Sequence, residues 1–234
     1  RPPNIERIVG INQDGDGGRP AAVRELPGSR LRDALRGAAT VLDARSPDAF
    51  DAGHLASAIN LPVIAAGVGT RAGWALTPEE PILIVADGAG MAATMASALH
   101  AVGLWETLGW TPADVSAWRR DDLPVAEAGS WDLEQLAASL RVGAVDLVDV
   151  REEPEWVTGH VVGSHHVPLH RLRDGRSVAL PDNGLPTAVA CAAGIRAAFA
   201  ASLLRRAGRR DVVRVAGGGV PDLDDHGIEL TVGA

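Results

Sequence analysis

The stretch 187–198, TAVACAAGIRAA, contains the only cysteine of the 234-residue chain. Cys191 follows a strand-like run and comes just before a helix-like segment that begins near Gly194. Glycine permits a sharp turn, and the backbone N–H groups at a helix N-terminus point toward the residues that precede it. The spacing C-x-x-G-x-R therefore predicts a backbone cradle for an anion, with the thiol of Cys191 at its centre.

This cradle favours a thiolate at Cys191, because a helix N-terminus and a nearby guanidinium both stabilise a negatively charged sulfur. The expected guanidinium is that of Arg196, so Cys191 and Arg196 are the predicted catalytic residues. A cysteine that served only as a small core residue would not need glycine and arginine at these offsets. The residues between them form the predicted backbone surface for a substrate anion or a persulfide: Ala192, Ala193, Gly194 and Ile195.

A basic segment, 170–176, could border this site. Arg171 and Arg173 are predicted to bind an anionic donor there, with the alternative that the segment is a solvated loop. A metal site at His165, His166 and His170 is not expected. Adjacent histidines on a strand point to opposite faces, and no carboxylate or thiol stands at ligand spacing from them.

The elements that must position Cys191 alternate between helix and strand. Helical spacing covers 131–141 and 194–207, with a short helical turn at 154–158, and strand-like runs cover 144–150, 187–190 and 211–215, with 165–168 extended. Such alternation is typical of an α/β domain with a mainly parallel central sheet, which binds ligands beyond the carboxyl ends of its strands. Cys191 lies at that end.

An internal repeat organises the chain. Residues 42–62 align without a gap on 148–168 at an offset of 106, a spacing that fits whole domains rather than solenoid units. We therefore expect a Gly/Asp-rich linker over 1–19 and two domains, 20–128 and 129–234, with the boundary near 126–130. The aligned pairs include Asp43 with Asp149, Arg45 with Arg151, Phe50 with Trp156, and His54 with His160.

Two consequences follow from the alignment. Asp149 and Arg151 are predicted to form a buried ion pair that fixes a loop above the sheet, rather than to act in catalysis. In the first copy Asp87 stands at the cysteine position and Ala92 at the position of Arg196, while Gly90 stands opposite Gly194. Both residues that carry the predicted chemistry are missing, so the first copy is predicted to be inactive.

Composition limits the function. The chain is 46% hydrophobic and carries a formal charge of −8 from 22 basic and 30 acidic residues, without a cluster that could follow a phosphate backbone. Nucleic acid is therefore not an expected partner. No apolar run approaches the roughly 20 residues that span a bilayer, and no signal-peptide core is visible. With a single cysteine, these features favour a cytoplasmic protein. Because the sequence starts at Arg1, we expect it to be a piece of a longer protein.

Both repeats resemble rhodanese homology domains, the thiosulfate sulfurtransferase family. The resemblance rests on the D-x-R and GH motifs, on the C-x-x-G-x-R loop and on VAGGGVPDL at 215–223. It implies two α/β rhodanese-like domains and a cysteine that carries sulfane sulfur. The loop Cys191 to Arg196 has the six residues of sulfur-transferring members, whereas related phosphatases and arsenate reductases have seven. Asp222 stands where many members carry tryptophan.

By this resemblance, Cys191 accepts sulfur from thiosulfate or a low-molecular-weight persulfide and passes it to a thiol or cyanide. No cofactor is implied beyond the covalent cysteine persulfide. The partners are then a small anionic sulfur donor and a thiol acceptor. Tandem members of the family commonly pair an inactive first copy with an active second one.

The first residues, RPPNIERIVGIN, resemble the segment that joins a metallo-β-lactamase-fold domain to rhodanese repeats in persulfide dioxygenase-like fusions. The residues present contain no H-x-H-x-D-H metal motif, so such an upstream domain would lie outside this sequence. The alternative function is a non-catalytic module that docks or regulates such a metalloenzyme. Phosphatase or arsenate reductase activity is a weaker third alternative.

Overall fold

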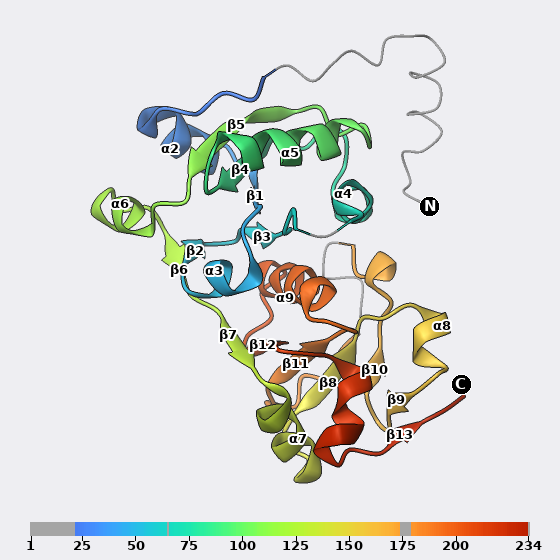
Figure 1. Ribbon diagram of the computed structural model, residues 1–234. Coiled ribbons are helices and arrows are strands. Elements are labelled where there is room, and N and C mark those ends of the chain that lie inside the picture. Colours follow the sequence, from blue (N-terminus) through green and yellow to red (C-terminus); the bar gives the residue numbers. More distant parts are fainter. Residues whose placement is uncertain (1–21, 65, 174–178, 234) are drawn as a thin grey trace, which may run out of the picture. The chain divides into compact units, whose positions relative to one another are not determined.

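A parallel sheet forms the centre of each of two units, which divide between Glu127 and Ala128 (Figure 1). The computed structural model describes residues 22–64, 66–173 and 179–233. The predicted linker 1–19 lies outside these residues. Below, unit 1 is the part before the division and unit 2 the part after it.

Unit 1 is built on a four-stranded sheet in the order β3-β1-β4-β5, and all of its strand pairs are parallel. The strands are β1 (Thr40–Asp43), β3 (Ile59–Asn60), β4 (Ile82–Ala86) and β5 (Thr107–Pro112), and β2 (His54–Leu55) pairs antiparallel with β6 (Val125–Ala126). The helices are α2 (Gly28–Arg36), α3 (Pro47–Asp51), α4 (Val68–Ala75), α5 (Ala89–His100) and α6 (Val115–Arg120).

Unit 2 repeats this plan with a five-stranded parallel sheet in the order β10-β8-β11-β12-β7. Its strands are β7 (Gly129–Trp131), β8 (Asp146–Asp149), β10 (His165–His166), β11 (Thr187–Ala190) and β12 (Val212–Val215), and β9 (His160–Val161) pairs antiparallel with β13 (Leu230–Thr231). The helices are α7 (Leu133–Arg141), α8 (Glu153–Trp156) and α9 (Ile195–Arg206), with 3₁₀ turns η1 (Leu169–Arg171) and η2 (Val220–His226).

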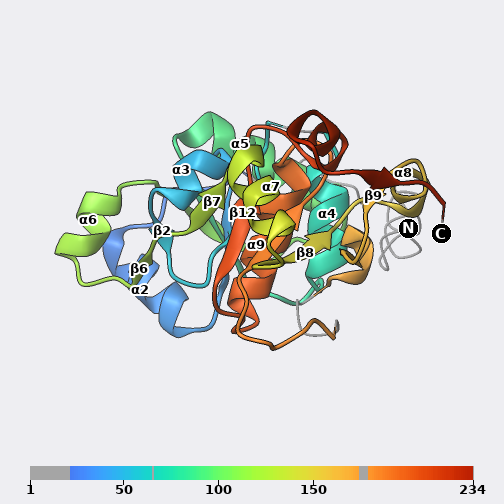
Figure 2. The same ribbon diagram turned by 90° about the horizontal axis from the view of Figure 1, so that it is seen from below.

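Two sheets with the same order of their central strands confirm the predicted α/β class. The central strands β4 and β11 are buried along their whole length, because helices cover both faces of a parallel sheet. Figure 2 shows α9 running alongside β12 in unit 2. Within the part of the chain that the structure describes, every helix is too short or too polar to span a bilayer.

The predicted helix over 131–141 starts two residues later than expected. The Asp132 carboxylate accepts a hydrogen bond from the N–H of Gln135 at 2.8 Å, and the Gln135 side chain accepts one from the N–H of Asp132 at 3.0 Å. This capping box fixes the helix start at Leu133. Trp131 instead belongs to β7, where it pairs with Val215.

A buried ion pair lies at the carboxyl end of β1 in unit 1 and of β8 in unit 2, as predicted for Asp149 and Arg151. Arg151 donates from Nε to Asp149 Oδ2 at 2.8 Å, and from Nη2 to the same oxygen and to the carbonyl of Gly159, both at 2.7 Å. Arg45 makes the same contacts in unit 1, to Asp43 and to the carbonyl of Gly53. We call each of these arrangements the Asp–Arg clamp.

We predict that Asp43→Ala lowers the free energy of unfolding of unit 1 by about 3–5 kcal/mol, because it leaves the buried Arg45 guanidinium uncompensated. Urea denaturation followed by circular dichroism measures this. Asp33→Ala is the matched control, since Asp33 pairs with Arg36 on the surface of the same unit. It should leave the midpoint nearly unchanged. Equal midpoints for the two variants would contradict a structural role for the clamp.

Candidate active site

Cys191 lies at the carboxyl end of β11, one residue after the strand ends, and its side chain is buried. The N–H of Gly194 donates a hydrogen bond to Cys191 Sγ at 3.1 Å. Gly194 caps α9 with a φ of +83°, a left-handed conformation that favours glycine. The backbone thus turns around the sulfur as the spacing C-x-x-G-x-R predicts, with Ala193 exposed at the rim.

Gly219 packs closely against the backbone of this loop. A Cβ on Gly219 would lie 2.1 Å from the carbonyl oxygen of Cys191 and 2.4 Å from that of Ala192, so no larger residue fits there. The N–H of Val220 donates to the Cys191 carbonyl at 2.9 Å. Asp222 accepts a hydrogen bond from the N–H of Gly219 at 2.8 Å, so it caps the start of η2. Sequence reasoning used the glycine run only as a family motif and missed this role.

Arg196 is held by a carboxylate that sequence reasoning did not single out. Its Nη1 and Nη2 donate to the two oxygens of Glu155 at 2.5 and 2.6 Å, and both side chains are about one-quarter to one-third exposed. The Glu155 hydrogen bonds raise the pKa of Arg196, partial burial opposes this, and the charge of Cys191 and a hydrogen bond with it add to the rise. Arg196 therefore interacts with both Glu155 and Cys191.

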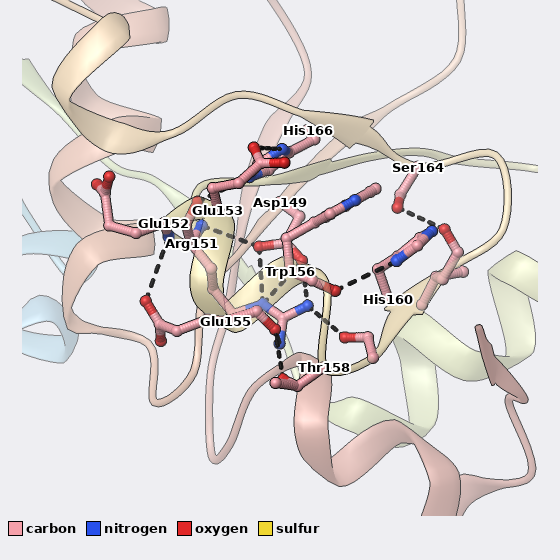
Figure 3. A network of polar contacts seen from close by, with 12 residues as sticks. Asp149, Arg151, Glu152, Glu153, Glu155, Trp156, Thr158, His160, Ser164 and His166 are labelled. Atoms are coloured by element: carbon pink, nitrogen blue, oxygen red, sulfur yellow. Dashed lines mark hydrogen bonds and ion pairs between the residues drawn. The ribbon is translucent and has the colours of Figure 1, made fainter. Parts of the chain in front are cut away.

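Glu155 itself is fixed by the Asp–Arg clamp of unit 2 (Figure 3). Its carbonyl oxygen accepts hydrogen bonds from Arg151 Nη1 at 3.3 Å and from Thr158 Oγ1 at 2.7 Å. Its carboxylate also accepts one from the N–H of Glu152 at 3.2 Å, which forms part of the cap of α8. The clamp thus positions the helix that presents Glu155 to Arg196.

The histidines of unit 2 contact aromatic and acidic neighbours. Trp156 stacks on His160 at 3.9 Å and on His166 at 4.3 Å between ring centroids. His166 lies 3.5 Å from a Glu153 oxygen, and His170 Nδ1 lies 2.7 Å from Glu152 Oε2. Among the residues that the structure describes, no three histidine, cysteine or acidic side chains form a group that could hold a metal ion.

Arg171 and Arg173, the predicted donor-binding residues, are exposed. Arg171 ends η1, and Arg173 has a φ of +28°. None of the hydrogen bonds and ion pairs of the described residues joins either side chain to the Cys191 loop. Arg176, from the same basic segment, lies outside the described residues. A role for Arg171 and Arg173 in donor binding stays a prediction.

The model of the rhodanese-like domain family matches this chain twice, over residues 29–121 and 132–223. The chain belongs to the rhodanese-like family. This confirms the family predicted from the motifs. Both units are therefore rhodanese-like domains, and only the second contains the cysteine.

The chain is also similar to individual proteins. The chain is 32% identical over 82 residues to the thiosulfate sulfurtransferase GlpE of Pseudomonas aeruginosa, a match that covers 35% of this chain and 73% of that protein. It is 32% identical over 72 residues to the uncharacterized protein YqhL of Bacillus subtilis, covering 31% of this chain and 56% of that protein. A rhodanese-related protein from Thermoplasma volcanium is 28% identical, with a TM-score of 0.39, over 45% of this chain and 99% of that chain.

The loop of the first rhodanese-like unit has a different shape. α5 starts at Ala89, two residues after the exposed Asp87, and Gly90 lies inside the helix. The backbone therefore does not turn around residue 87 as it does around Cys191. Burial raises the pKa of Asp43, hydrogen bonds from Arg45 oppose this, and the nearby Asp87 carboxylate adds to the rise. This unit thus differs from the second in its loop conformation as well as in its residues.

We predict opposite effects for alanine at the two aligned glycines. Gly194→Ala should destabilise unit 2 by about 1–2 kcal/mol, because its left-handed backbone disfavours a side chain. Gly90→Ala should stabilise unit 1 by about 0.5–1 kcal/mol, because a Cβ there meets open space in a helix. Thermal unfolding of both variants measures this. Shifts of the same sign would show that the two loops share one backbone conformation.

The Glu155–Arg196 ion pair predicts a pH dependence of stability. The hydrogen bonds from Arg196 lower the pKa of Glu155 below its ordinary value of 4.5, and partial burial opposes them. The stabilisation is therefore fully present above pH 4.5 and is lost as the pH falls through the lowered value. The difference in urea midpoint between the native chain and Glu155→Gln should be constant above pH 4.5 and shrink in stronger acid. A difference independent of pH would contradict the lowered pKa.

Proposed function

We propose that this chain is a sulfurtransferase in which Cys191 carries the transferred sulfur as a persulfide. The observation that carries this proposal is the buried thiol with the Gly194 N–H at 3.1 Å from its sulfur and Arg196 beside it. A thiolate in such a cradle is a nucleophile held by backbone dipoles. Kinship with a thiosulfate sulfurtransferase supports the same reaction class.

The reaction has two steps. The Cys191 thiolate attacks the sulfane sulfur of thiosulfate or of a low-molecular-weight persulfide, so a new S–S bond forms while the S–S bond of the donor breaks and sulfite or a thiolate leaves. An acceptor thiolate or cyanide then attacks the outer sulfur. This forms a persulfide or thiocyanate and returns Cys191 to the thiolate. The Cys191 persulfide is the only covalent intermediate, so the reaction needs no further cofactor.

The chain's own groups have distinct roles in these steps. The backbone N–H groups around residues 192–195 stabilise negative charge on the attacking and transferred sulfur atoms. Arg196, held by its ion pair with Glu155, lies beside the thiolate and interacts with its charge. Unit 1 lacks both the cysteine and the arginine, so we assign it no part in the chemistry. An upstream metallo-β-lactamase-fold domain stays a prediction, since the residues that suggest it lie outside the described part of the chain.

We predict that Cys191→Ser abolishes sulfur transfer from thiosulfate to cyanide while the protein still folds, because the chain has no other thiol. Intact-protein mass after incubation with thiosulfate should show one added sulfur atom on the native chain, removable by a reductant, and none on the variant.

Asp87→Ala is the control, since it changes the aligned residue in the copy without cysteine, and it should transfer sulfur at nearly the native rate. Retained transfer in Cys191→Ser would exclude the persulfide mechanism. A folded native chain that takes up no sulfur from thiosulfate or persulfide would instead support the non-catalytic docking module.

A further inference from the structure

The Glu155 carboxylate occurs only in the unit that contains the cysteine, although both units have the same fold. The two units share the Asp–Arg clamp and the stack of an aromatic ring on a histidine. They differ at the position of Glu155, where unit 1 has Ala49, and at the position of Arg196, where unit 1 has Ala92. A pair needed for folding would be expected in both copies. This pair occurs only beside the thiol.

The geometry of the pair determines how its charge can act. Both terminal nitrogens of Arg196 point to the Glu155 carboxylate, at 2.5 and 2.6 Å. Such a fork-to-fork contact fixes the guanidinium. The adjacent carboxylate charge opposes the field of the guanidinium at longer distance. The positive charge that would draw a donor anion toward Cys191 is thus largely neutralised before the donor arrives.

The other charged groups near the pair also take part in interactions. Arg151 is paired with Asp149, and the buried Arg214, whose Nη1 would lie 3.9 Å from a Cβ on Gly194, is engaged in an interaction as well. The other two carboxylates of the α8 region, Glu152 and Glu153, face His170 and His166. Once Cys191 is a thiolate, the loop and its ion pair together carry net negative charge.

We propose that Glu155 is a positioning residue that sets donor specificity, so that the Cys191 site takes singly charged alkyl persulfides in preference to the thiosulfate dianion. Glu155 fixes the Arg196 guanidinium through both terminal nitrogens and limits the negative charge that the site accepts. An alkyl persulfide carries a single negative charge, on its sulfur atoms. Thiosulfate is a dianion, and its sulfonate group brings additional negative charge into the same loop. This inference rests on the proposed sulfur transfer, and it adds which donor class that reaction uses.

The first test measures charge selection at Cys191 without sulfur transfer. Alkylation by iodoacetate, an anion, is compared with alkylation by neutral iodoacetamide in the native chain, in Glu155→Gln and in Glu153→Gln. Glu155→Gln should raise the ratio of the two rates by about 3- to 10-fold, the effect of one partly solvated charge a few ångströms away. Glu153→Gln removes the same charge from the same helix without touching Arg196, and its ratio should stay within about 2-fold of native. An unchanged or lower ratio in Glu155→Gln would overturn the proposal.

The second test uses the proposed reaction. The ratio of kcat/KM for thiosulfate to kcat/KM for cysteine persulfide should rise by about 3- to 10-fold in Glu155→Gln, mainly through a lower KM for thiosulfate. If the native chain transfers sulfur from neither donor, the proposed function fails. If it transfers sulfur but the ratio does not change, only the role of Glu155 fails.

The native chain alone also tests the proposal, should Glu155→Gln not fold. A site with net negative charge repels thiosulfate, and salt screens that repulsion. The KM for thiosulfate should therefore fall or stay constant as sodium chloride is raised. A KM that rises with salt would show that a free positive charge binds the donor, which would overturn the proposal.

Discussion

The buried ion pair between Asp149 and Arg151 is the contact on which the rest of the site depends. Arg151 binds the carboxylate at the end of β8, the carbonyl of Gly159 after α8, and the carbonyl of Glu155 within α8. The Arg151 guanidinium therefore links the end of β8 both to α8 and to Gly159, which follows α8. A buried charge persists only where its partner is fixed, so the same contact that satisfies Asp149 also fixes α8. The carboxylate that α8 presents to Arg196 takes its position from this arrangement.

The duplication separates what the fold requires from what the chemistry requires. Phe50 stacks on His54 at 3.7 Å in unit 1, as Trp156 stacks on His160 at 3.9 Å in unit 2, and each unit has its own Asp–Arg clamp. These contacts remain in a copy that has no thiol. The left-handed glycine of the loop and the Glu155–Arg196 pair are absent from that copy. The contacts retained in both copies therefore stabilise the domain, and we propose that those specific to unit 2 act on Cys191.

The sequence allowed β8, β10, β11 and β12 of unit 2, the clamp and the turn at Cys191 to be predicted, because each depends on neighbouring residues or on the repeat. It did not predict β7, whose Trp131 was assigned to the helix that follows. Glu155 could not be selected in the same way. Three glutamates surround Pro154, and they are equivalent in sequence. Only the register of α8 against α9 decides that one of them meets an arginine 41 residues later. A comparison of the two copies could have singled out Glu155, since unit 1 has alanine at the positions of both Glu155 and Arg196. The different backbones at Gly90 and Gly194 were not predictable either, because an identical glycine fits both a helix interior and a left-handed cap.

The charge at the Cys191 loop depends partly on a residue outside the loop. Apart from the thiol of Cys191, only Arg196 of its six residues has an ionisable side chain, while Ala192 and Ala193 contribute methyl groups and backbone. The backbone N–H groups stabilise any anion in the turn, so they do not distinguish one sulfur donor from another by charge. In the proposed reaction that distinction depends on Arg196, whose field depends on Glu155, which is fixed in turn by Arg151. On this proposal a buried structural pair at the end of one strand controls the electrostatics at the end of the next strand, and the cysteine need not change for the preferred donor to change.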